Sequence, residues 1–108
     1  MTDLPNEHAL FERAAAIVAR VTAAGGTRAD AVGEVVRDLE VSPLHAGRLI
    51  AGYPARTAVK ALWELRLYYD VADLRQWEAM TRRPPPAALD ALAGCYRLPR
   101  VKLGGLPR

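Results

Sequence analysis

Residues 32–51 have the sequence VGEVVRDLEVSPLHAGRLIA, and this stretch decides the fold class. In its first half, apolar residues recur at the three- and four-residue spacing of an amphipathic helix: Val32, Val35, Val36 and Leu39. The run from Glu40 to Pro43 breaks this pattern. Ser42 is a good N-cap, and Pro43 suits the first helical position because its missing N–H has no helical partner there. The stretch therefore predicts two short helices joined by a tight turn, the second running through Ile50.

The same alternation of helical periodicity and helix breakers continues on both sides. A first helix is expected to begin after Asp3 or Asn6 and to stop at Gly25-Gly26, and Thr27 with Asp30 resembles a capping box for the next helix. Downstream, periodic apolar residues predict helices over about residues 54–69, 71–80 and 87–93, the last closed by Gly94. Because residues 54–69 are apolar over most of the helix circumference, we expect that helix to be the central, buried one.

The length and composition indicate one helical domain. A chain of 108 residues has room for one hydrophobic core, and much of its apolar content is alanine, which favours helix over sheet. The predicted fold class is therefore all-α: a small orthogonal bundle of five to six short helices over residues 1–94. Residues 95–108 contain two prolines, Gly104-Gly105 and four cations, and we expect them to form an extended basic C-terminal arm.

The net charge of +3 is unevenly distributed. Residues 1–81 carry nine Lys or Arg and eleven Asp or Glu, a net charge of −2, whereas residues 82–108 carry six Lys or Arg and one acid, a net charge of +5. Any electrostatic attraction to a polyanion is thus expected to come mainly from the arm.

Few residues are of the types that carry enzyme or metal chemistry. His8, His45 and Cys95 are the only histidines and cysteine, and they lack the spacing of a zinc site or of a Cys-His pair. Gly25-Gly26 lacks the lysine and preceding strand of a phosphate-binding loop. We therefore expect no enzyme activity, metal or cofactor. The chain also has no apolar run long enough to cross a bilayer, so the prediction is a cytoplasmic protein that does not insert into a membrane.

Residues 32–51 resemble the helix-turn-helix of DNA-binding proteins. Val41 matches the apolar residue that anchors the turn, and Ser42 matches the cap that opens the recognition helix. Two positions depart from the family: Val36 stands where a small residue is usual, and Glu40 stands where glycine is usual because the turn often needs a left-handed conformation. A plain helical hairpin is the alternative interpretation of this segment.

The resemblance implies a small regulator that binds double-stranded DNA, as a homodimer if it spans two half-sites. Its third helix would enter the major groove with Ser42, Pro43, Leu44, Gly47 and Arg48 facing outward and His45 beside them. Arg48 would contact guanine, Ser42 a phosphate or base, and Leu44 a thymine methyl group. Other cations would bind phosphates: Arg56 and Lys60 from the next helix, and Arg97, Arg100 and Lys102 from the arm.

The second hypothesis is a helical protein-interaction module, an adaptor or inhibitor. It would bind a partner protein through its aromatic region or its tail. The aromatic residues gather in the second half of the chain: Trp63, Tyr68, Tyr69, Trp77 and Tyr96. We expect both tryptophans to pack in the core, and the alternative for them is a dimer interface or a partner groove.

Overall fold

The computed structural model describes residues 7–104, and all regular secondary structure in this part of the chain is helical. In chain order the elements are α1 (Glu7–Ala23), α2 (Arg28–Leu39), α3 (Pro43–Ala51), α4 (Ala55–Glu64), α5 (Val71–Glu78), α6 (Pro86–Tyr96) and the 3-10 helix η1 (Arg100–Leu103). The prediction of a small all-α bundle with five to six short helices is confirmed. None of the helices between residues 7 and 104 has the length and apolar content needed to cross a membrane.

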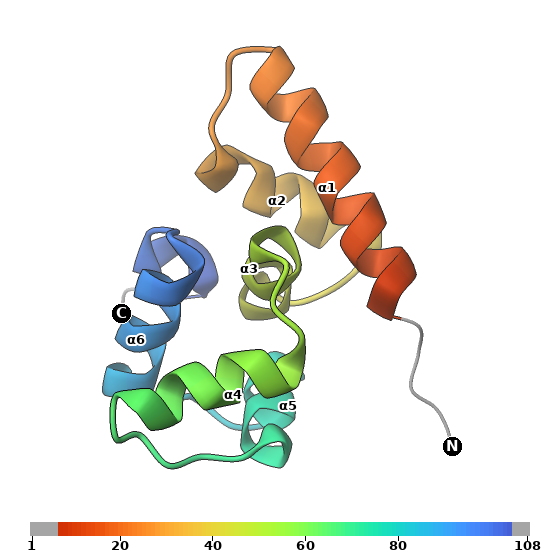
Figure 1. Ribbon diagram of the computed structural model, residues 1–108. Helices are drawn as coiled ribbons and strands as arrows, with labels where there is room; N and C mark the ends of the chain where they lie inside the picture. The colour runs from red at the N-terminus through yellow and green to blue at the C-terminus, as the bar shows by residue number, and fades with distance from the viewer. Residues whose placement is uncertain (1–6, 105–108) are drawn as a thin grey trace.

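Helix α3 is the centre of the molecule. In Figure 1 it lies between the α1–α2 pair above, α4 and α5 below, and α6 at the side, and it packs against α1, α2, α5, α6 and η1. Five of its nine residues are buried: Leu44, Ala46, Gly47, Arg48 and Leu49. The prediction that the helix over residues 54–69 would be the central one is wrong, because neighbours surround the shorter helix before it.

Helix α4 ends five residues earlier than its apolar pattern predicts. Arg66 adopts the left-handed conformation with φ 65°, its N–H donates to the carbonyl of Trp63, and the N–H of Leu67 donates to the carbonyl of Leu62. These bonds satisfy carbonyls at the helix end, as in a Schellman motif. Only Ala58 and Leu62 of α4 are buried, so the rest of its apolar surface lies near or in solvent.

The predicted N-terminal caps are present. The side chain of Thr27 accepts from the N–H of Asp30, and Asp30 accepts from the N–H of Thr27, which makes a complete capping box. Ser42 caps α3, with Pro43 in its first turn, and Asp70 with Asp73 forms a second capping box at α5. The caps proposed at Asp3 and Asn6 lie outside the described residues.

The C-terminal segment belongs to the core as far as Gly104. Leu98 and Leu103 are 5% and 3% exposed, and a Cβ on Gly47 would collide with the side chain of Leu103, so η1 packs directly on the backbone of α3. Arg28 donates hydrogen bonds to the carbonyls of Tyr96 and Arg97. The prediction of an extended arm is therefore wrong for residues 97–104; residues 105–108 lie outside the described range.

Helix α6 also continues past its expected end. Gly94 lies inside it, and the helix stops at Tyr96, where Arg97 takes the left-handed cap conformation with φ 58°. Tyr96 is fully buried and packs edge-on against Tyr53, with ring centroids 5.6 Å apart. The last turn of α6 is packed through this contact, and the helix ends at Tyr96 instead of at Gly94.

Candidate functional site

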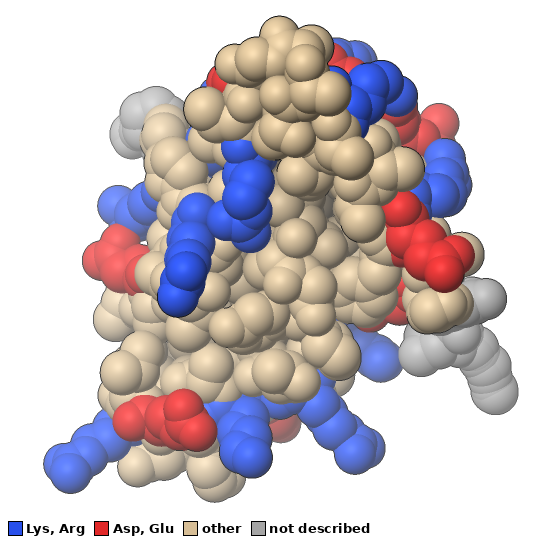
Figure 2. Space-filling model, turned by 45° about the horizontal axis from the view of Figure 1, so that its top comes forward, with Lys and Arg blue, Asp and Glu red and all other residues tan. Residues whose placement is uncertain are grey.

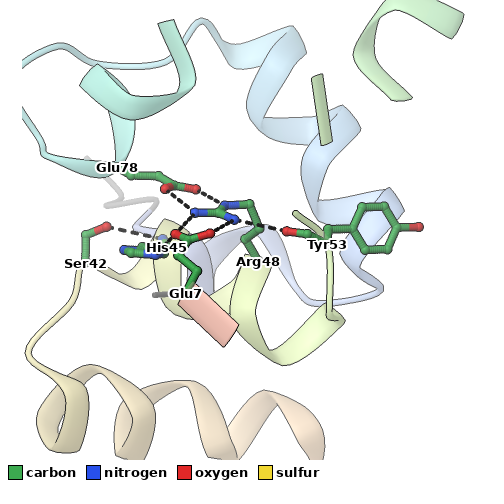
Figure 3. Close-up of polar contacts among 6 residues, drawn as sticks. All are labelled: Glu7, Ser42, His45, Arg48, Tyr53 and Glu78. Carbon is green, nitrogen blue, oxygen red and sulfur yellow. Dashed lines mark hydrogen bonds and ion pairs between the residues drawn. The ribbon is translucent and has the colours of Figure 1, made fainter. Parts of the chain in front are cut away.

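A buried ion cluster ties three helices together around Arg48. Its guanidinium makes a two-bond contact to Glu78 of α5, with Nε 2.6 Å from Oε2 and Nη2 3.0 Å from Oε1. A second two-bond contact joins it to Glu7 of α1, with Nη2 2.6 Å from Oε2, and Nη1 also donates to the carbonyl of Tyr53 (Figure 3). Arg48 is 2% exposed, so α1, α3 and α5 share one charged core contact.

The charges in this cluster stabilise one another. Burial alone lowers the pKa of Arg48, but its hydrogen bonds to Glu78 and Glu7 outweigh that effect and raise the pKa above its ordinary value. The hydrogen bond from Arg48 lowers the pKa of Glu7, and His45 adds to this effect from 3.0 Å. Arg48 is therefore a permanent cation inside the fold. Its guanidinium donates all of its hydrogen bonds to residues of this chain.

This arrangement corrects the predicted DNA-reading face of α3. Leu44, Gly47 and Arg48 were expected to face outward, and all three are buried. Ser42 uses its hydroxyl to cap the N–H of His45, and the His45 ring contacts Glu7 (Figure 3). Glu40 does take the left-handed conformation, with φ 56°, at the position where helix-turn-helix proteins usually have glycine. Because α3 is covered by its neighbours, its side chains offer no base-contacting face.

The other predicted DNA contacts fall into two separate groups. Arg56 and Lys60 are exposed on α4, which packs against α5 and α6. The C-terminal cations lie at or near η1, which packs against α2, α3 and α6. Arg97, Arg100 and Lys102 are all exposed, and Arg100 pairs with Asp90 at 3.0 Å. On the face in Figure 2, basic side chains stand singly or in small groups between acidic and uncharged areas. That face has no continuous basic stripe.

A different surface stands out on α4. Trp63 and Tyr68 are 53% and 64% exposed, and their rings make an edge-on contact with centroids 5.1 Å apart. The indole of Trp63 donates to the carbonyl of Tyr69 at 2.7 Å, which fixes the ring in its exposed position. Arg56, Val59, Lys60 and Trp63 line a shallow hollow beside it. We call these five residues the α4 surface: Arg56, Val59, Lys60, Trp63 and Tyr68.

The prediction that both tryptophans pack in the core is correct for Trp77 and wrong for Trp63. Trp77 is 2% exposed, whereas Trp63 is about half exposed. The sequence carried one signal for this difference. Trp63 follows Arg56 and Lys60 at intervals of seven and three residues, which places it on the same helix face as two cations.

The acidic partner on α1 makes a pH prediction possible. Since the pKa of Glu7 is lower in the folded protein, its contribution to stability is present above the ordinary pKa of 4.5 and is lost as pH falls through the folded value. We expect Glu7→Gln to cost about 1.5 kcal/mol at neutral pH, because a charge-assisted bond is weakened. Urea unfolding between pH 7 and 3 should show this difference shrinking as acid is added. A difference that stays constant down to pH 3 would contradict the assigned role.

The remaining candidate chemistry groups are dispersed. Burial raises the pKa of the half-buried Cys95 thiol, which makes it a poorer nucleophile. Between residues 7 and 104, no three His, Cys, Asp or Glu side chains gather in a way that could hold a metal ion. Comparison with known proteins gives no match: no protein-family model, curated protein or solved structure is significantly similar to this chain.

Proposed function

We propose that this protein is a helical protein-interaction module that binds a partner through the α4 surface. The observation that carries the proposal is the exposed pair Trp63 and Tyr68 beside Arg56 and Lys60. Tryptophan, tyrosine and arginine are the residue types most enriched at the energetic centres of protein interfaces. Trp63 is already held in place by its bond to Tyr69, so little side-chain entropy is lost when a partner covers it.

The charge of the α4 surface identifies the kind of partner. Its two charged residues, Arg56 and Lys60, are both cations, and Arg66 follows shortly after; Glu64 is the one acid between residues 55 and 69. A partner segment that combines acidic and apolar side chains would complement both the cations and the rings. An amphipathic helix with an acidic border has this composition and suits a shallow hollow. The proposed partner is such a segment of another protein.

The double-stranded DNA hypothesis has less support. Its base-reading residue, Arg48, already binds two carboxylates, and Leu44 is buried. The α4 cations are two positive charges, whereas specific DNA-binding proteins commonly make six or more phosphate contacts. For these reasons DNA binding is tested below as a competing outcome. A homodimer through the α4 surface is tested in the same way.

The partner can be found and the proposal tested in one sequence of experiments. A photo-crosslinking residue is placed at Tyr68, and in a matched protein at Val101, which is also 64% exposed but lies on η1. A protein crosslinked in native cells from position 68 alone is then purified, and its affinity is measured by calorimetry. We expect Tyr68→Ala to weaken binding about 30-fold, the effect of losing an interface hot spot, and Val101→Ala to have no effect.

Charge reversal tests the acidic character of the partner. Lys60→Glu should weaken binding at least tenfold at low salt, and the loss should shrink as salt is added, because salt screens exposed charges. Lys102→Glu makes the same charge change on η1 and should leave binding intact. The proposal fails if the purified partner binds Tyr68→Ala and Lys60→Glu as tightly as the wild type. It also fails if position 68 crosslinks to DNA or to a second copy of this chain.

A further inference from the structure

A second hollow lies where the start of α3, the end of α5 and η1 meet. Its volume is about 290 Å³. Three buried apolar side chains contribute to its lining: Leu44, Trp77 and Leu103, each less than 5% exposed. Together with Ser42, Arg82 and Arg83 at its polar side, they define what we call the Trp77 groove.

The polar lining of the Trp77 groove favours an anion. No acidic side chain lines it, whereas Arg82 and Arg83 do. Arg82 is paired with Asp73 at 2.6 Å, but Arg83 makes no ion pair with any described residue. The N-terminus of the nine-residue helix α3 opens at the same place. Pro43 has no N–H and Ser42 already caps the N–H of His45, so the start of α3 offers the N–H of Leu44 and the partial positive charge of a helix N-terminus.

The indole of Trp77 supplies the independent observation. Its Nε1–H is buried and has no hydrogen-bond partner, although Trp77 lines the groove. A buried donor left without an acceptor is costly, so nearly all such groups in folded proteins have one. A ligand oxygen that entered from the groove would satisfy this donor once the indole had turned toward it, because the nitrogen itself is inaccessible in this conformation. The same oxygen would meet Arg83 and the start of α3 at the same time.

We propose that the Trp77 groove binds a small organic carboxylate with an apolar tail. The tail would cover Leu44 and Leu103, and the carboxylate would accept from the Trp77 indole and pair with Arg83. A volume near 290 Å³ is at the lower end for ligand sites, which suits a molecule of about ten non-hydrogen atoms. The site shares no residue with the α4 surface, so it does not depend on the proposed partner.

The test compares 3-phenylpropionate with its neutral amide, 3-phenylpropionamide, by NMR on the full ¹⁵N-labelled protein. The two tryptophan indole resonances are assigned with Trp63→Phe, and binding is then measured on the wild type. We expect the carboxylate to shift the Trp77 indole resonance saturably and to bind at least tenfold more tightly than the amide. Arg83→Gln should weaken carboxylate binding several-fold, whereas Lys102→Gln should not.

Three results would overturn the proposal. They are the absence of a saturable shift at millimolar carboxylate, equal affinity for the amide, and binding that Arg83→Gln leaves unchanged. Because Arg83 is exposed, that variant is expected to fold normally, which its amide spectrum verifies. Tyr68→Ala should retain carboxylate binding. A negative result for the Trp77 groove can therefore be distinguished from a negative result for the α4 surface.

Discussion

The Arg48→Met variant is expected to lose about 3 to 5 kcal/mol of unfolding free energy, the cost of breaking a buried ion pair by removing one partner. The substitution keeps most of the apolar stem but leaves the carboxylates of Glu7 and Glu78 facing each other without a cation. Domains of this size have a total stability of about 5 to 15 kcal/mol, so a large share would be lost. Urea unfolding at neutral pH, followed by circular dichroism, measures the change.

Two further variants establish the cause. Arg56→Met makes the same substitution at an exposed position on α4 and should change stability by less than about 0.5 kcal/mol. Adding Glu78→Leu to Arg48→Met should recover much of the loss, because apolar replacement of a whole buried pair is often neutral. If Arg48→Met were as stable as Arg56→Met, the cluster would not hold the helices together. The guanidinium of Arg48 would then be available for other contacts.

The double variant Leu98→Ala, Leu103→Ala should be at least as severely destabilised. Each buried leucine replaced by alanine costs about 2 to 5 kcal/mol, and both side chains pack near Gly47 of α3. Because they share this neighbour, the two costs need not add exactly. Thermal unfolding of each single variant and of the pair measures the effect, and the pair should be largely unfolded at 37 °C.

The control for this experiment lies in the same segment. Val101 of η1 is 64% exposed, so Val101→Ala should melt within a few degrees of the wild type. A folded, stable double variant would show that residues 97–104 are a dispensable arm, as their composition alone suggests. The predicted loss would instead show that this basic segment is a structural part of the domain.

Local signals in the sequence accounted for most helix starts. Thr27 and Ser42 cap the helices that they were expected to cap, and Asp70 caps α5 in the same way, because an N-cap needs only a short polar side chain and an N–H three residues later. Helix ends were less predictable. Glu40, Arg66 and Arg97 take left-handed conformations without being glycine, and their side chains carry no indication of this. The apolar pattern over residues 54–69 therefore overestimated the length of α4.

The candidate sites depended on which helix became central. The resemblance to a helix-turn-helix placed Arg48 on an outward face, and nothing local to α3 indicates Glu7 or Glu78, which are 41 and 30 residues away. Trp63 is exposed for the same reason: α3, and not α4 as expected, is the central helix. The Trp77 groove is lined by three segments that are distant in sequence, and no sequence motif predicts it.

The sequence by itself determined the helical class, the capped helix starts and the breaks between helices. Those features depend on residues within one or two turns of each other. Only the tertiary structure decided that α3 lies in the centre, that Arg48 is a core ion, and that the basic C-terminal segment packs through Leu98 and Leu103. The physical reason is that burial and charge pairing are settled by contacts between distant segments. Those contacts depend on how the helices pack, which local periodicity does not specify.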